Sequence, residues 1–405
     1  MRTLKRREFL AAGTLALGGT LLTSRLAFAE TAATDEARLI FVIMRGALDG
    51  LAAVPPYGDP GYAGLRRELA LTPPGAGAGA LPLNGFFGLH PSMSFLRSAY
   101  GDGELTVFHA VSSPYRERSH FDGQDVLENG SVHPHALQSG WLNRALASLQ
   151  AGHVSPKESG VALGQNVPLL MRGPASVTSW SPSKLAALDD DTLQRVTDLY
   201  ASDSLLSRRL ADALAADAIA GGDAPTMQAA ASKSARYAEI ARAAAGFLRR
   251  EDGPRIAVFD TTGWDTHANE GGAEGQLAGR LTALDEGLRT LKEELGPTWS
   301  RTAVVLATEF GRTAATNGTR GTDHGTGAAA FLVGGAVHGG RVIADWPGLS
   351  ARDLYQGRDL RPTLDLRSVL KGVLAEHLHV SAAALEDWVF PDSAAAKPVE
   401  GLMRV

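Results

Sequence analysis

The chain has 405 residues, of which 44% are hydrophobic and 20% are charged, a composition typical of globular proteins. Its formal net charge is −5, and no basic cluster follows the first thirty residues, which excludes the polyanion-binding surface of a nucleic-acid-binding protein. The absence of cysteine excludes disulfides, thiolate metal ligands and cysteine nucleophiles.

Residues 1–29 have the pattern of a twin-arginine signal peptide. The motif Lys5-Arg6-Arg7-Glu8-Phe9-Leu10 precedes a short apolar run, and Ala27-Phe28-Ala29 is a small-x-small cleavage site. The run is too short and too rich in Gly and Thr for a membrane span, and the alternative is a basic amphipathic anchor helix. We therefore expect the chain to fold before the twin-arginine translocase exports it to the periplasm or beyond. After residue 30 no apolar run approaches the length of a membrane span.

Apolar runs that read as buried strands alternate with helical segments along the chain. The predicted strands are 39–44, 105–111, 255–259, 302–307 and 328–333, with short strand-like pieces in 160–170. The predicted helices are 92–100, 137–150, 275–295 and 364–378, and residues 55–88, rich in Pro and Gly, are predicted as loop. This alternation favours an α/β fold with a parallel sheet and helices on both faces.

Residues 189–250 differ in composition from the rest, being rich in Ala, Leu, Asp and Arg. Three helices are predicted here, at 192–200, 204–220 and 226–250. We interpret the segment as a helical insertion, either a lid or padding, within a single domain that covers residues 30–405.

Residues that could bind a metal or take part in catalysis are concentrated at the strand ends, where open α/β sheets bind their ligands. Four predicted strands lead into loops with a carboxylate, two of these loops also contain a histidine, and so does the loop that enters the fifth strand. Converging carboxylates repel one another unless a cation or a shared proton compensates, and with nearby imidazoles we expect a divalent metal such as zinc, manganese or calcium. The predicted ligands are Asp49, Asp265, His267, Glu309, Asp323 and His324.

Other residues in these loops suit ester chemistry on an anionic group. Arg45, Arg118 and Arg312 could clamp a tetrahedral oxyanion. Ser119 stands where a nucleophile could, or could position an attacking water, and His120 could serve as acid or base.

Each of these residues also has a local alternative. Ser119 could cap a helix that begins near Phe121, and Asp49 could be a helix cap or a turn residue. Glu309 could pair with Arg312 on the surface. His120 could be a satisfied core histidine, and Asp323-His324 a hydrogen-bonded turn.

Six segments together resemble one family, the twin-arginine-exported proteins grouped as domain of unknown function 1501, within the alkaline phosphatase and sulfatase superfamily. They are Arg45-Gly46-Ala47-Leu48-Asp49-Gly50, Phe87-Gly88-Leu89-His90-Pro91, Arg118-Ser119-His120-Phe121-Asp122, Gly263-Trp264-Asp265-Thr266-His267, Thr308-Glu309-Phe310-Gly311-Arg312-Thr313 and Gly321-Thr322-Asp323-His324-Gly325. The resemblance implies a mixed, mainly parallel sheet with a metal site at the strand ends. It implies Asp49, Asp265, His267 and His324 as ligands and Ser119 as the nucleophile.

The chain departs from the superfamily pattern at Glu309-Phe310, where its phosphatases have an Asp-His pair. Phe310 cannot bind a metal, so one ion is expected instead of two. The preferred hypothesis is an exported metal-dependent hydrolase of phosphate or sulfate esters, acting on a small or polymer-borne anionic ester. The alternative, which the departure favours, is a non-catalytic exported binding or assembly factor on the same fold. A third hypothesis is a polysaccharide-modifying protein of the cell surface.

Overall fold

The computed structural model describes residues 37–150, 160–182, 190–220 and 233–404. The twin-arginine motif and the cleavage triplet lie outside these residues. Residues 38–405 form one compact unit. No helix in the described ranges is both long enough and apolar enough to cross a membrane.

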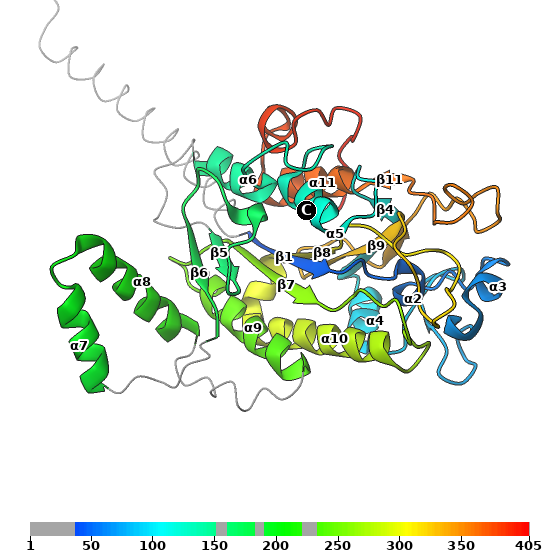
Figure 1. The fold of residues 1–405 in the computed structure, drawn as a ribbon, viewed down its shortest axis with the longest axis horizontal. Helices are drawn as coiled ribbons and strands as arrows, with labels where there is room; N and C mark the ends of the chain where they lie inside the picture. The colour runs from blue at the N-terminus through cyan, green and yellow to red at the C-terminus, as the bar shows by residue number, and fades with distance from the viewer. Residues whose placement is uncertain (1–36, 151–159, 183–189, 221–232, 405) are drawn as a thin grey trace, which may run out of the picture. The chain divides into compact units, whose positions relative to one another are not determined.

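The core of this unit is a nine-stranded, mostly parallel sheet (Figure 1). Strand β9 runs antiparallel to both of its neighbours, β4 and β8, and the other pairings in this sheet are parallel. The order across the sheet is β10 (Arg341–Ile343), β4 (Leu105–Ser112), β9 (Ala328–Val333), β8 (Thr302–Ala307), β1 (Arg38–Arg45), β7 (Ile256–Thr262), β5 (Gly160–Leu163) and β6 (Val177–Trp180), with β11 (Leu364–Asp365) also paired to β4. The five strands predicted from apolar runs are confirmed.

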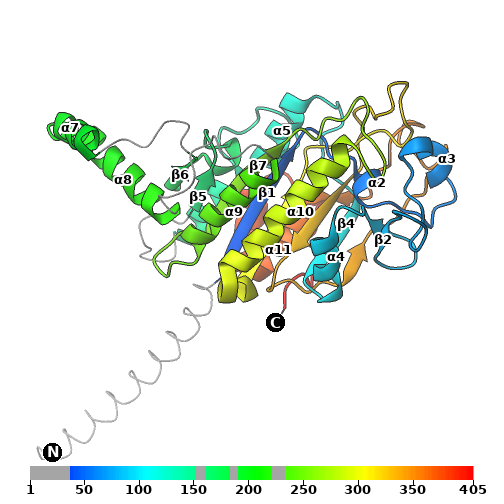
Figure 2. The ribbon, with the colours of Figure 1, turned by 90° about the horizontal axis from the view of Figure 1, so that it is seen from below.

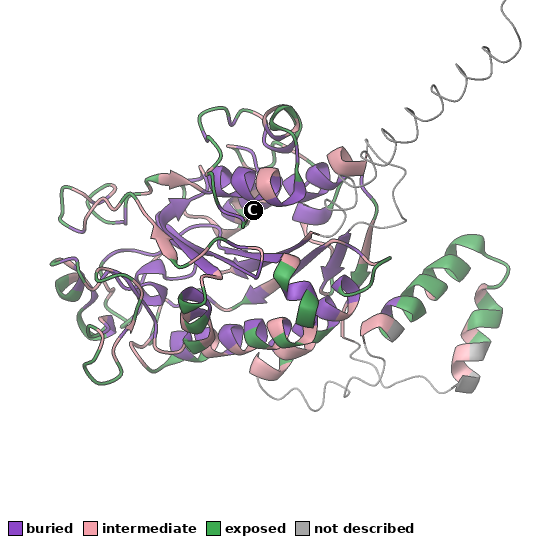
Figure 3. Ribbon diagram, turned by 180° about the vertical axis from the view of Figure 1, so that it is seen from behind, coloured by how far each residue is buried: buried purple, intermediate pink, exposed green. Residues whose placement is uncertain are grey.

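Helices cover both faces of the sheet, which explains why its central strands are continuous apolar runs (Figures 2 and 3). One face carries α4 (Ser94–Gly101), α9 (Lys233–Leu248) and α10 (Gln276–Leu295). The other carries α5 (His120–Asn129), α6 (Trp141–Gln150) and α11 (Leu366–Leu378). Helix α10 buries leucines at helical spacing, including Leu277, Leu281, Leu284, Leu288 and Leu291. The predicted α/β class, a mainly parallel sheet between two helical layers, is confirmed.

The segment predicted as loop, 55–88, has more order than its Pro and Gly content indicates. It is preceded by α2 (Gly50–Ala53) and contains α3 (Tyr62–Arg66), the 3-10 helix η1 (Arg67–Leu69) and an antiparallel pair of strands, β2 (Leu81–Pro82) and β3 (Gly88–Leu89). These elements are too short to show a periodic apolar pattern. The helix predicted at 364–378 begins at Leu366, two residues after its predicted start. Residues Leu364–Asp365 instead pair with β4, and Asp365 caps the helix.

The predicted insertion contains α7 (Asp190–Tyr200) and α8 (Ser204–Ala220), followed by α9. Helix α9 packs on α10 and contacts β7, whereas α8 contacts α9 and β6. The first residues of the predicted helix 226–250 lie outside the described part of the chain. The remaining short elements are η2 (Leu169–Met171), η3 (Gly296–Arg301), α12 (Ala382–Ala384) and η4 (Leu385–Val389).

The strand directions bring four loops to one edge of the sheet. Strands β1, β4, β7 and β8 are parallel, so the loops that follow them emerge at the same edge. Because β9 runs the other way, it begins at this edge, and residues 321–327, the second part of the β8–β9 loop, lie there as well. The predicted site residues belong to these four loops or adjoin them, with Arg45 at the end of β1 and His120 at the start of α5.

Candidate metal centre

The loop after β7 is fixed by close backbone packing against the end of β1. Gly46 has φ +117°, and a Cβ there would lie 2.7 Å from the backbone nitrogen of Asp265. Trp264 is fully buried, and its Nε1 donates to Thr261 Oγ1. Only glycine permits this approach, which sets where Asp265 and the residues after it lie.

Three side chains from two of these loops meet at one point. His267 Nε2 lies 2.9 Å from His324 Nε2 and 3.0 Å from Asp265 Oδ1. His324 Nε2 lies 3.3 Å from the same Asp265 oxygen. An isolated antiparallel bridge between Arg312 and His324 holds the second loop in place.

A fourth side chain, His120, completes the group from the first residue of α5. Donor atoms of His120, Asp265 and His324 all lie within 4.8 Å of one another. His120 Nε2 is buried without a hydrogen-bond partner, and it lies 3.5 Å from Asp265 Oδ2. The four side chains, His120, Asp265, His267 and His324, are called the His/Asp cluster below.

The other ring nitrogen of each histidine is held by a hydrogen-bond acceptor. His120 Nδ1 contacts Glu309 Oε1 at 2.8 Å, and His267 Nδ1 contacts Asp323 Oδ1 at 3.2 Å. His324 Nδ1 contacts the carbonyl oxygen of Arg118 at 2.9 Å. A carbonyl and an ionised carboxylate can only accept, so these partners assign the proton to Nδ1 in each neutral ring. Each Nε2 then carries a lone pair.

This arrangement fits a divalent cation. Unprotonated Nε2 atoms that point at each other and at a carboxylate oxygen repel unless a positive charge lies between them. Four ligands at about 2.0–2.1 Å from zinc would lie about 3.3 Å apart, close to the separations found here. Carboxylate or carbonyl partners on the second nitrogen are the usual support of metal-binding histidines. Three imidazoles and one carboxylate suit zinc or manganese better than calcium, which takes oxygen ligands.

The charges around the cluster favour ionised acids. Burial alone would raise the pKa of Asp265, but the hydrogen bond and charge of Arg312 outweigh it and hold this pKa below its ordinary value. Burial is likewise outweighed at Glu309, whose pKa is lowered by its hydrogen bond from His120. In return, Glu309 raises the pKa of His120. Burial and the neighbouring His120 lower the pKa of His324, which keeps its ring neutral.

The three predicted arginine clamps are already paired. Arg312 is buried, and its Nη1 lies 2.6 Å from Asp265 Oδ1. Arg118 is bound to Asp359, with Nε 2.8 Å from Oδ2. Arg45 contacts Glu128 and Asp260, each at 2.7 Å. These guanidinium groups support neighbouring carboxylates in this structure.

Glu309 and Asp323, both predicted as metal ligands, instead contact the Nδ1 atoms of His120 and His267, on the side of each ring away from the other cluster residues. Asp323 also accepts from Asn317 Nδ2 at 3.0 Å, a bond that lowers its pKa. Glu309 Oε1 accepts from the backbone of Gly46 at 2.8 Å. Both carboxylates therefore orient the cluster.

Asp49 does not join the cluster. It caps α2 by accepting from the Ala52 amide, and it is ion-paired with buried Arg66. Arg66 Nη2 also lies 3.5 Å from Glu270 Oε1, so one buried cation faces two carboxylates. Burial and the charge of Asp49 raise the pKa of Glu270 to about 8, whereas Arg66 keeps the pKa of Asp49 low despite its burial. The helix-cap alternative for Asp49 is the one found.

Ser119 is the N-cap residue of α5, directly before His120. Its side chain makes no capping hydrogen bond to the helix, and its backbone amide donates to the Tyr115 hydroxyl at 3.2 Å. Arg118, the residue before it, has φ +63°, a conformation that non-glycine residues rarely adopt. The Ser119 hydroxyl therefore lies at the N-terminus of α5 without capping the helix.

Some residues that shape the site were not among the predicted site residues. Phe310 is buried and stacks on His120, with ring centroids 5.1 Å apart and planes at 28°. Thr322 Oγ1 links Arg312 Nε to Glu270. Gln124 donates to Glu309 at 3.2 Å, one turn after His120 on α5. The only indication of Gln124 in the sequence is its position four residues after His120, which places both on one face of a helix.

The chain is an α/β protein whose candidate chemistry lies at the carboxyl ends of its strands. It belongs to the family described as protein of unknown function DUF1501, whose model matches residues 36–389. No protein of curated function matches the sequence.

Several solved structures are similar to this chain at low identity. The C-terminal periplasmic domain of EcEptC from Escherichia coli, in complex with Zn, is 10% identical with a TM-score of 0.34, and the match covers 74% of this chain and 73% of that one. A TAB5 alkaline phosphatase variant with bound Mg is 13% identical with a TM-score of 0.34, covering 74% and 92%. The phosphonate monoester hydrolase of Agrobacterium radiobacter is 11% identical with a TM-score of 0.32, covering 85% and 74%. Similarities this distant assign no activity to this chain.

Proposed function

We propose that this protein is an exported hydrolase of phosphate or sulfate esters that uses one divalent metal ion. The observation that carries the proposal is the convergence of three Nε2 atoms on Asp265 while each Nδ1 is held by an acceptor. In this proposal His120, Asp265, His267 and His324 bind the ion, and zinc suits this donor set best.

The ion supplies Lewis-acid polarisation of the ester's phosphoryl or sulfuryl oxygen when it is bound. Glu309 and Asp323 fix the rings of His120 and His267 through Nδ1, and the Arg118 carbonyl fixes His324. Arg312 orients Asp265. These contacts hold the donor atoms in place before any ion arrives, which lowers the reorganisation needed on binding.

Ser119 is the proposed nucleophile, or the group that positions an attacking water. Its hydroxyl precedes the first turn of α5, whose free backbone N–H groups stabilise negative charge. With His120 Nε2 committed to the ion, His120 acts as a ligand in this proposal instead of as the acid or base.

Export through the twin-arginine route forms part of the proposal. The pair Arg6-Arg7 within its motif and the cleavage triplet support it. This route carries folded proteins, so a metal centre could be loaded before transport.

The test is metal analysis together with turnover of 4-nitrophenyl phosphate and 4-nitrophenyl sulfate, using protein purified from the exported fraction. We expect one ion per chain and hydrolysis of at least one ester, lost in Ser119→Ala and Asp265→Ala. Ser300→Ala is the matched control, because Ser300 is exposed and precedes the opposite end of β8. Protein without metal and without turnover overturns the proposal.

The second candidate function is a non-catalytic exported binding or assembly factor. The observation that favours it is Phe310, which packs on His120 and cannot bind a metal. Stoichiometric metal with no turnover of either ester would support this candidate.

A further inference from the structure

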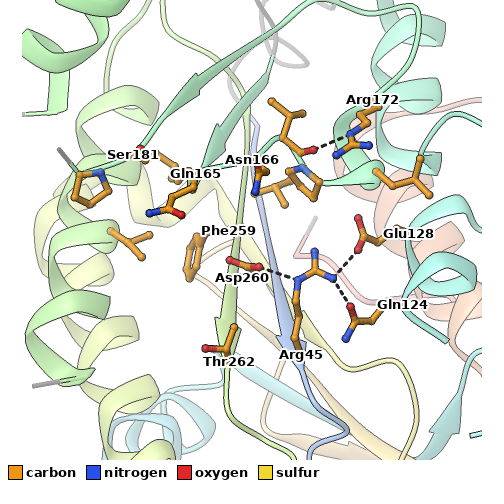
Figure 4. Close-up of a pocket in the computed structure, with 18 of the residues that line it drawn as sticks. Arg45, Gln124, Glu128, Gln165, Asn166, Arg172, Ser181, Phe259, Asp260 and Thr262 are labelled. Carbon is orange, nitrogen blue, oxygen red and sulfur yellow. Dashed lines mark hydrogen bonds and ion pairs between the residues drawn. The ribbon is translucent and has the colours of Figure 1, made fainter. Parts of the chain in front are cut away.

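A cavity of about 760 Å³ opens at the carboxyl ends of three adjacent strands, β1, β7 and β5 (Figure 4). Arg45 and Asp260 come from the ends of β1 and β7, and Gly164–Leu169 form the loop after β5. The volume falls in the range of small-molecule sites. None of the residues assigned above to the His/Asp cluster lines it.

Two residues, Gln124 and Glu309, link this cavity to the His/Asp cluster. Gln124 lines the cavity and accepts from Arg45 Nη1 at 3.0 Å, while its Nε2 donates to Glu309 Oε1. Glu309 in turn holds His120. A ligand that fills the cavity therefore lies one side chain away from the support of the candidate metal centre.

The cavity is polar but presents no net positive charge. Its lining contains three arginines and four carboxylates. Arg45 is neutralised by its contacts with Glu128 and Asp260, which Figure 4 shows as dashed lines. An anionic ligand would be repelled by this lining, so a neutral ligand is favoured.

The other residues that line the cavity could bind the hydroxyl groups of a ligand and pack against the face of its ring. Figure 4 draws Gln165, Asn166 and Ser181 without a hydrogen bond to the other residues shown there. Amide and hydroxyl groups of this kind donate and accept, as ligand hydroxyls require. Phe121, next to His120 on α5, leaves 85% of its surface exposed at this cavity and offers a flat apolar face.

We propose that this cavity binds a neutral, polyhydroxylated, sugar-like group, the part of the substrate that carries the ester. The assignment of this group to the substrate rests on the hydrolase function proposed above, whereas the binding itself does not. The ester would then project past Gln124 toward the His/Asp cluster.

Saturation-transfer difference NMR on the exported chain tests the binding without any turnover. The probes are the neutral methyl glycosides of glucose, galactose and mannose, with glucose 6-sulfate as the anionic comparison, all measured in EDTA. We expect at least one neutral glycoside to bind and glucose 6-sulfate not to bind more tightly. Phe121→Ala should raise the dissociation constant about tenfold through loss of an exposed aromatic contact.

Trp388→Ala is the matched control, because Trp388 is also exposed, at 49%, and does not line the cavity. It should leave binding unchanged. Absence of binding by all three neutral glycosides overturns the inference, as does equal weakening by both variants. Glycoside binding without ester turnover would instead contradict the hydrolase function and support the binding site proposed here.

Discussion

The Nε2 atoms of His267 and His324 lie 2.9 Å apart, and the acceptors at their Nδ1 atoms place the proton of each neutral ring on Nδ1. Asp265 Oδ1 lies 3.0 Å and 3.3 Å from these two atoms. Between neutral rings, two lone pairs and a carboxylate oxygen at such distances repel one another, and a cation between them removes this repulsion.

Removal of a cluster side chain should abolish stoichiometric zinc binding. We expect His324→Ala and Asp265→Ala each to weaken zinc about 100-fold or more, because each deletes one of four ligands. His338→Ala is the control, since His338 contacts the Gly401 carbonyl away from the cluster. Competition titration against a chromophoric chelator measures the affinities. Equal affinity in all three variants would contradict the assignment.

Glu309→Gln should lower the pKa of His120. The hydrogen bond and charge of Glu309 raise this pKa above its ordinary value, and glutamine removes the charge while keeping the size. NMR titration of the metal-free protein follows the His120 ring directly. Zinc affinity should also fall by about 10–100-fold through loss of ligand support.

Glu104→Gln provides the matched control for that titration. Glu104 pairs with Lys292 just before β4 begins, at the opposite edge of the sheet. An unchanged His120 titration in Glu309→Gln, or an equal change in both variants, would show that Glu309 does not set the protonation of His120.

Gly46→Ala should destabilise the fold and weaken zinc binding together. A Cβ at this position meets the Asp265 backbone at 2.7 Å, and φ +117° is strained for alanine by about 1–3 kcal/mol. Gly64→Ala in α3 is the control, because its Cβ would meet nothing within 4 Å. Urea unfolding should show a loss for Gly46→Ala and no loss for Gly64→Ala. Wild-type zinc affinity in Gly46→Ala would mean that this packing does not place Asp265.

Glu270→Gln should flatten the dependence of stability on pH. The pKa of Glu270 is raised from 4.5 to about 8 by burial and by Asp49, so the folded chain keeps a proton that the unfolded chain releases in this window. The free energy of unfolding therefore falls as pH rises from about 4.5 to 8, by at most about 1.4 kcal/mol per pH unit. Glutamine mimics the neutral acid and removes this loss.

Urea unfolding at pH 5, 6, 7 and 8 in EDTA compares the two proteins. The stability of Glu270→Gln relative to the wild type should increase steadily from pH 5 to pH 8. Parallel profiles would show that Glu270 is ionised in the folded protein throughout.

The sequence was sufficient for the five central strands of the sheet and for the edge at which the site residues lie, whereas the short strands β6, β10 and β11 were not predicted. Continuous apolar runs such as 302–307 have few interpretations other than a buried strand, and each was found. The antiparallel direction of β9 could not be predicted from its apolar run. It is this direction that brings Asp323 and His324, which precede their strand, to the same edge as Asp265.

The sequence could not predict which role each carboxylate has in the site. A carboxylate after a strand can bind an ion, orient a histidine or cap a helix. The local sequence pattern is the same for all three roles. Asp265, Glu309 and Asp49 take up three different positions because of partners remote in the chain: Arg312, His120 and Arg66. Phe310, which argued against a second ion, contributes instead by packing on His120.

The most direct test of the central claim is a crystal structure of the zinc-loaded protein with anomalous difference maps on both sides of the zinc absorption edge. We predict one zinc peak bound by His120 Nε2, His267 Nε2, His324 Nε2 and Asp265. No peak in this position, or a peak held by other residues while the two histidine rings keep their contact, would contradict the account.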